Sequence, residues 1–138
     1  MCLTHSWPVI PIVTPEEMAA IDAAAPEPVE VLIERAGAAV ARAAVDLLGG
    51  AYGRRVTVVA GKGNNGADGR AAARRLRRRG VRVVEVDARR MPAELPPADL
   101  LVDAAYGTGF KGTWEPPPVP PGTPVLAVDV PTGVDGLT

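Results

Sequence analysis

The sequence predicts an α/β fold: an open, mostly parallel sheet with flanking helices. In some segments apolar residues recur every three or four positions, and in others they form short β-branched runs. These helical and extended segments alternate, which is the order that right-handed crossovers in a parallel sheet require. The chain has 138 residues, enough for one domain. We expect residues 1–13 to form an N-terminal tail and residues 14–138 to form the domain.

The first helix is predicted from a capping signal. Thr14 precedes Pro15, and Glu17 follows three residues after Thr14. A Thr side chain and a Glu at this spacing can each bond the other's backbone amide, and Pro is tolerated in the first turn. Met18 and Ile21 supply a short apolar stripe.

A second helix is predicted over residues 28–48, followed by a stop at Gly49 and Gly50. Apolar residues recur at helical spacing and predict its buried face. These residues are Leu32, Ala36, Val40, Ala43 and Leu47.

The first strand is predicted over residues 56–60, because this run is short, β-branched and nearly all apolar, as expected of a central strand covered on both faces. A helix is then predicted over residues 67–79, ended by Gly80. It places Ala72, Ala73 and Leu76 on one face and arginines on the other, which we interpret as a solvated face.

Three further strands are predicted over residues 81–87, 100–106 and 124–130. The connection at residues 88–99 has room for a short helix at most. Residues 111–123 carry five prolines and predict an extended connector, because proline lacks an amide donor and clashes with the preceding helical turn. Trp114 is expected to anchor this connector.

Composition excludes several classes of function. The net charge is −1, so no global field attracts nucleic acid or an anionic membrane. No apolar run approaches the ~20 residues that span a bilayer. The single Cys2 cannot form an intrachain disulfide, and the first residues lack the pattern of a secretory signal, which favours a cytoplasmic protein. His5, in the tail, is not expected to be catalytic.

A glycine-rich turn is the first chemical signal. Residues 61–66 match G-x-G-x-x-G directly after a predicted strand and at the start of a predicted helix. Glycines let backbone amides approach a diphosphate, and the helix N-terminus favours negative charge. The alternative is a tight turn with no ligand.

Acidic residues follow the strands. Asp103 and Asp129 lie near the ends of the third and fourth predicted strands, and Asp68 lies near the start of the helix after the first. In an open parallel sheet these ends meet at the ligand crevice. Asp87, at the end of the second strand, could bind ribose hydroxyls. Each carboxylate could equally cap a loop or face solvent.

Four motifs occur in order: LIERAG at residues 32–37, GKGNNGADG at 61–69, VDAAYGTG at 102–109 and AVDVPTGVD at 127–135. In order and spacing they resemble the NAD(P)H-hydrate epimerases, the YjeF N-terminal domain family. The resemblance covers about residues 14–138. It implies a Rossmann-like nucleotide-binding domain.

The resemblance also implies an activity, the interconversion of the R and S forms of hydrated NADH and NADPH in cofactor repair. It implies a potassium ion as cofactor, a homodimer, and an ADP- or ATP-dependent NAD(P)HX dehydratase as a fused or separate partner.

Site residues are carried over by motif position. The resemblance implies that the substrate contacts Asn64, Asn65, Gly66, Ala67, Asp68, Gly107, Thr108, Gly109, Phe110, Lys111, Gly112, Thr113 and Asp129. It implies that potassium is bound by Asn65, Asp103 and Thr132, whose oxygen atoms suit a hard cation. Asp129 is our candidate for the acid and base that removes and returns water; the alternative is that Asp129 orients the ligand while Asp68 or Asp103 shapes the electric field.

The chain departs from the family pattern at several points. Ala67 replaces a glycine, which is harmless if its φ is negative, and Thr132 replaces a serine. The proline-rich connector stands where the family has a helix, and the chain stops where relatives continue through further strands, so we expect a fragment or an abbreviated domain with an exposed sheet edge.

Two other functions fit part of the pattern. One is a non-catalytic Rossmann-like nucleotide-binding or scaffolding module. The other is a redox domain that uses intact NAD, although no hydride-handling partner or second domain is evident.

Overall fold

The computed structural model describes residues 12–116 and 118–134. Within these residues four strands form one parallel sheet in the order β2-β1-β3-β4. The strands are β1 (Arg55–Ala60), β2 (Arg82–Asp87), β3 (Leu100–Ala104) and β4 (Val125–Ala127). The α/β class and the parallel sheet are therefore confirmed. Most of the predicted tail, including Cys2 and His5, lies outside the described residues.

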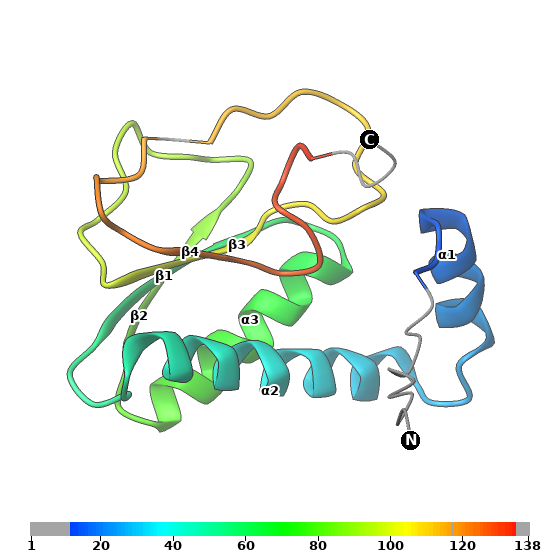
Figure 1. Ribbon diagram of the computed structural model, residues 1–138, viewed down its shortest axis with the longest axis horizontal. Helices are drawn as coiled ribbons and strands as arrows, with labels where there is room; N and C mark the ends of the chain where they lie inside the picture. The colour runs from blue at the N-terminus through cyan, green and yellow to red at the C-terminus, as the bar shows by residue number, and fades with distance from the viewer. Residues whose placement is uncertain (1–11, 117, 135–138) are drawn as a thin grey trace, which may run out of the picture.

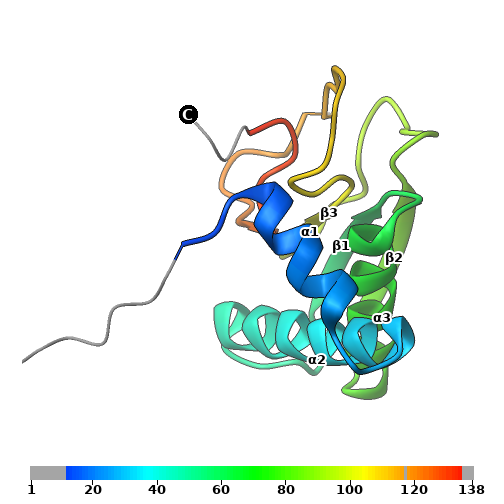
Figure 2. The same cartoon turned by 90° about the vertical axis from the view of Figure 1, so that its right-hand side faces the viewer.

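Three helices accompany the sheet: α1 (Pro15–Ala24), α2 (Val29–Leu48) and α3 (Asn64–Arg78). Figure 1 shows α2 and α3 together on one face of the sheet, while the long loops cover the other face. Figure 1 shows α1 to one side of the sheet, apart from the other two helices, and Figure 2 shows it in front of the sheet. None of the described helices combines the length and the hydrophobicity that crossing a bilayer requires.

The capping signal of α1 is confirmed. The Thr14 hydroxyl accepts a hydrogen bond from the Glu17 amide at 3.2 Å, and the Glu17 carboxylate accepts one from the Thr14 amide at 2.7 Å. No side chain of α1 is buried, however, and Met18 and Ile21 are 43% and 54% exposed. The cap and not a packed face therefore defines this helix.

The prediction of the buried face of α2 is wrong: the buried residues lie one position further along the helix than predicted. The buried residues are Gly37, Ala41, Ala44 and Leu48, whereas Leu47 is 58% exposed. Small residues form the contact because α2 packs closely on α3: a Cβ added at Gly37 would overlap the Cβ of Ala71.

Helix α3 begins three residues earlier than predicted, with Gly63 as N-cap, so Asn64, Asn65 and Gly66 form its first turn. Ala67 thus lies within the helix, and among the described non-glycine residues only Asp129 has a positive φ. The replacement of glycine at position 67 therefore carries no backbone strain. The predicted apolar face of α3 is confirmed, since Ala72, Ala73 and Leu76 are fully buried.

The last two strands are shorter than predicted. β3 ends at Ala104 instead of residue 106, and β4 has 3 residues instead of seven. The Val128 amide still donates to the Asp103 carbonyl at 2.8 Å, but Asp129 then adopts φ 70°, which ends the extended conformation.

The two connections contain no helix among their described residues, as predicted for the proline-rich one. They cover the face of the sheet that α2 and α3 leave open. There Val59, Leu101 and Ala105 form a buried cluster with Ala88 and Leu95. Trp114 packs against this cluster, and its indole N–H donates to the Ala88 carbonyl at 3.3 Å, so it anchors the connector as expected.

Candidate functional site

The glycine turn is set by close backbone contacts. A Cβ at Gly61 would overlap the carbonyl oxygen of Ala105, and a Cβ at Gly66 would overlap the carbonyl oxygen of Gly61. The Gly61 amide donates to the Ala104 carbonyl at 3.0 Å, and the Arg70 guanidinium donates to the Gly61 carbonyl at 2.9 Å. The turn therefore lies directly against the end of β3.

Gly63 differs from these glycines. No other atom lies within 4 Å of a Cβ placed there, and the residue is exposed at the start of α3. The space in front of Gly63 is open to a ligand at the helix N-terminus, where backbone amides favour an anion.

A cleft of about 820 Å³ opens beside this turn, at the carboxyl ends of β1 and β3. Its walls come from α1, α2, the start of α3 and the segments that follow β3 and β4. Of the predicted substrate contacts it is lined by Asn64, Asn65, Asp68, Gly107, Thr108, Gly109, Phe110, Lys111 and Asp129. Gly66, Ala67, Gly112 and Thr113 lie outside its lining.

Gly107 brings two predicted site residues together. A Cβ added at Gly107 would lie 2.8 Å from Oδ2 of Asp129 and 3.6 Å from Cγ of Asn65. Asp129 Oδ2 also accepts a hydrogen bond from the Thr108 amide at 2.9 Å. The strained φ of Asp129 and this bond together hold the carboxylate against the loop after β3.

Asp103 and Thr132 form a second group beside the cleft. The Thr132 amide donates to Asp103 Oδ2 at 2.8 Å, and the Thr132 hydroxyl donates to Asp103 Oδ1 at 2.6 Å. The same hydroxyl lies 3.2 Å from the Tyr106 carbonyl and accepts from the Tyr106 amide at 3.2 Å. Two motifs that are separate in the sequence are therefore bonded directly.

Asn65 does not join this group through a hydrogen bond between described residues. The side-chain nitrogen of Asn65, Nδ2, is buried and has no hydrogen-bond partner among the described residues. Asn65 is thus placed near Gly107 and Asp129, while Asp103 and Thr132 are paired with each other.

Asp68 lines the cleft as a partly buried carboxyl group. Burial, followed by the charges of Asp129 and Asp22, raises its pKa to about 6. A carboxyl with such a pKa can give and take protons near neutral pH.

Asp87 does not face the cleft as a free carboxylate. Arg89 donates to it from its amide at 2.9 Å and from two guanidinium nitrogens at 3.1 and 2.8 Å. These bonds hold the pKa of Asp87 well below its usual range.

Several residues of the site were not predicted. Met18 and Asp22 of α1 and Ala36, Ala39 and Val40 of α2 line the cleft. Tyr106 stacks on Phe110 with ring centroids 4.1 Å apart and meets Trp114 edge-on at 5.9 Å. The position of Tyr106 directly before a glycine loop was the available signal for it, but nothing in the sequence placed α1 at the cleft.

Comparison with known proteins finds a matching family model, curated relatives and a similar solved structure. The family model described as YjeF-related protein N-terminus matches residues 29–92. The chain is 35% identical to an NAD(P)H-hydrate epimerase of Leuconostoc mesenteroides, over 92% of this chain and 72% of that protein. The crystal structure of yeast ynu0 is similar with a TM-score of 0.64 and 27% identity, covering 91% of this chain and 72% of that one.

Longer relatives also match. The chain is 37% identical to a protein of Pyrobaculum aerophilum named bifunctional NAD(P)H-hydrate repair enzyme Nnr, over 76% of this chain but 28% of that protein. It spans little more than a quarter of such bifunctional relatives. Because the fold is shared and the match covers most of the Leuconostoc mesenteroides epimerase, this chain belongs to the NAD(P)H-hydrate epimerase family, which carries the YjeF-related N-terminal domain.

Proposed function

We propose that this chain binds a hydrated reduced nicotinamide dinucleotide, NADHX or NADPHX, in the cleft and interconverts its R and S epimers. The names of its relatives support the reaction. The observation that carries the proposal is the placement of Asn65, Gly107 and Asp129 together at the carboxyl ends of parallel strands. Ligands of open α/β sheets bind at these ends.

The cleft offers different chemistry at its two sides. The open N-terminus of α3 at Gly63 suits the diphosphate, because no side chain of a described residue caps its amides. On the other side the Asp129 carboxylate suits the hydrated ring, from which a hydroxyl leaves and to which water returns. Asn64, Asn65, Asp68 and the loop at residues 107–113 are the remaining proposed contacts.

We also propose potassium as the cofactor, held by Asn65, Asp103 and Thr132. The donor set fits, because the Asp103 carboxylate, the Thr132 hydroxyl and the Tyr106 carbonyl gather their oxygens at one place. The unpartnered amide of Asn65 also fits, since a half turn of this amide would put a buried oxygen where a cation could satisfy it. The ion would supply positive charge beside an anionic substrate.

The compartment, the oligomeric state and the partner enzyme are proposed from the family. We propose a cytoplasmic homodimer that acts with a dehydratase specific for the same hydrates, either fused or separate. The bifunctional relatives support this coupling.

The test is an epimerisation assay in potassium buffer. Pure R-hydrate is mixed with the chain and the S epimer is followed by chromatography. We expect acceleration above the spontaneous rate, and a loss of about 100-fold or more in Asp129→Asn. Asp46→Asn, an exposed carboxylate at the far end of α2, is the matched control and should retain full activity.

The alternative function, a non-catalytic binding module, predicts a different outcome of this assay. Such a protein would bind NADPH, followed through the fluorescence of the reduced ring, yet leave the epimerisation rate unchanged. Acceleration that is equal in the wild type and in Asp129→Asn would contradict the assignment of Asp129.

A further inference from the structure

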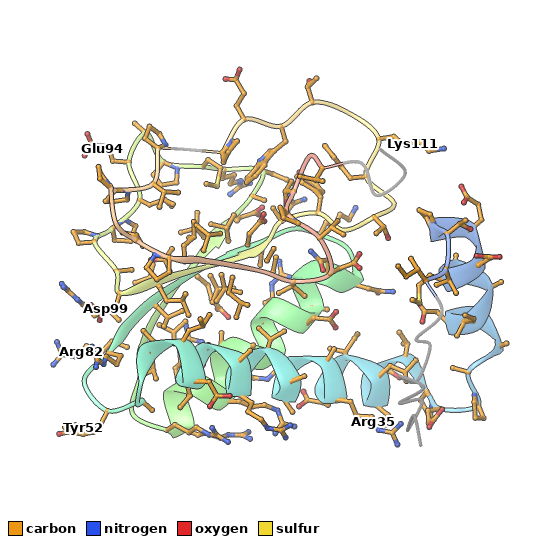
Figure 3. The ribbon with its side chains drawn as sticks, viewed as in Figure 1. Arg35, Tyr52, Arg82, Glu94, Asp99 and Lys111 are labelled. Atoms are coloured by element: carbon orange, nitrogen blue, oxygen red, sulfur yellow. The ribbon has the colours of Figure 1, made fainter. Side chains whose placement is uncertain are left out.

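Three carboxylates from three different elements line the same cleft. Asp22 comes from α1, Asp68 from α3, and Asp129 from the segment after β4. The α2 residues at the cleft are uncharged, and among the described lining residues Lys111 is the cationic one. Figure 3 shows Lys111 extending outward from its loop, and it is exposed. The charge inside the cleft is therefore negative.

The three carboxylates have different surroundings. The Asp129 carboxylate accepts a hydrogen bond from the Thr108 amide. No donor among the described residues reaches Asp68, which is partly buried at the start of α3. The charges of Asp129 and Asp22 both act on the Asp68 carboxyl.

We propose that Asp68 is the catalytic residue that transfers the proton to and from the hydroxyl of the hydrated ring, while Asp129 stabilises the positive charge that forms on that ring. This inference rests on the proposed function and divides a role that Asp129 alone was expected to fill. Burial and the two neighbouring carboxylates, which raise the pKa of Asp68 to about 6, suit it to proton transfer in both directions near neutral pH.

The chemistry balances without any further reactant. The Asp68 carboxyl gives its proton to the hydroxyl, the C–O bond breaks, and the lone pair of the adjacent ring nitrogen forms a C=N bond. Water and a cationic ring result. Water then adds to the opposite face, the C=N electron pair returns to nitrogen, and the released proton goes back to Asp68. Fixed negative charge beside the ring stabilises the cation formed between these steps.

Asp22 acts in this scheme through Asp68 and is a positioning residue. It is carried by a helix that buries no side chain of its own yet lines the cleft. Helix α1 thus brings a charge to the site without contributing to the hydrophobic core. Removing that charge should lower the pKa of Asp68 and leave the core unchanged.

The experiment compares Asp68→Asn, Asp22→Asn and a control on the same helix, Glu16→Gln, whose side chain does not line the cleft. We expect Asp68→Asn to lower kcat by about 100-fold or more, with the dissociation constant for NADPH within about threefold of the wild-type value. In the wild type kcat/KM should fall as pH rises through about 6, where Asp68 loses its proton. Asp22→Asn should move this fall of kcat/KM by about half a pH unit to lower pH, and Glu16→Gln should leave its pH unchanged.

A carboxyl-carbon NMR titration of the ligand-free wild-type chain tests the same assignment without turnover. An Asp68 pKa near the ordinary value would overturn the inference, as would an Asp68→Asn variant that keeps more than a third of the wild-type kcat. If the wild type binds NADPH but does not accelerate epimerisation, the proposed function itself fails. An active wild type with an equally active Asp68→Asn variant defeats only the role of Asp68.

Discussion

At the scale of single residues, the glycines of the turn after β1 have different tasks. Gly61 and Gly66 are required because backbone atoms of Ala105 and of Gly61 occupy the space of a side chain. Gly63 has free space in front of it. The G-x-G-x-x-G pattern predicted such a turn, but only the packing shows that its first and last glycines serve the fold and its middle glycine faces the cleft.

Substitution of these glycines should therefore have unequal effects on stability. Gly61→Ala places a methyl group against a backbone oxygen that cannot move without displacing β3, and we expect it to lower the free energy of unfolding by about 3 kcal/mol. Gly63→Ala is the matched control and should cost less than about 1 kcal/mol, because its φ is −82° and no atom is near. Urea denaturation of both variants measures the difference, and equal midpoints would contradict this account of the turn.

The raised pKa of Asp68 also predicts how stability depends on pH. Its pKa is about 6 in the folded chain and 3.8 when unperturbed, so the folded state binds the proton more tightly. The contribution of Asp68 to the free energy of unfolding is then greatest below pH 3.8 and is lost as the pH rises through about 6. Asp68→Asn removes that loss, so it should be more stable than the wild type by about 1 kcal/mol at about pH 8 and equal to it near pH 3.5. A variant less stable at the higher pH would show that Asp68 is not destabilised by burial.

At the scale of elements, the order of helices and strands could be predicted because each has a local signal: the cap of α1, the period of α2 and the β-branched run of β1. Which face of α2 is buried could not be predicted to the residue, because it depends on how α2 packs against α3. The length of β4 could not be predicted from local pattern either, because Asp129 leaves the extended conformation where its carboxylate contacts the distant loop after β3. Likewise Asp22 has no sequence signal that places it beside Asp68.

The contact between α2 and α3 leads to a further prediction. Gly37→Val places a branched side chain where even a Cβ would meet Ala71 and lie 2.9 Å from the Ala72 amide nitrogen. We expect a loss of about 3 kcal/mol in the free energy of unfolding, because the two helices must separate. Ala39→Val introduces the same side chain at an exposed position of the same helix and should cost about 0.5 kcal/mol, because Val is a poorer helix former than Ala. Similar losses in both variants would contradict a close contact between α2 and α3 at Gly37.

At the scale of the whole molecule, the cleft exists only through tertiary structure. Its walls combine α1, the first turn of α3 and the segments after β3 and β4, which are far apart in the sequence. One face of the sheet is covered by α2 and α3 and the other by loops, as Figure 1 shows. The resemblance of four motifs predicted that Asp103 and Thr132 meet, and the structure bonds them directly, across a chain separation of 29 residues. A ligand that binds only where these distant segments meet binds the folded state and should stabilise it.

The proposed potassium ion should therefore stabilise the whole fold. An ion that binds only the folded state, at a concentration about tenfold above its dissociation constant, adds about 1.4 kcal/mol to the free energy of unfolding. We expect a higher melting temperature in potassium chloride than in choline chloride at equal ionic strength. Thr132→Val keeps the shape of the side chain but removes the hydroxyl that joins Asp103 and Tyr106, so the difference between the salts should vanish. Thr123→Val, whose hydroxyl makes no side-chain hydrogen bond among the described residues, should keep the difference. Equal melting temperatures of the wild type in both salts would rule out a stabilising potassium site at Asp103 and Thr132 while leaving the epimerase proposal to its own assay.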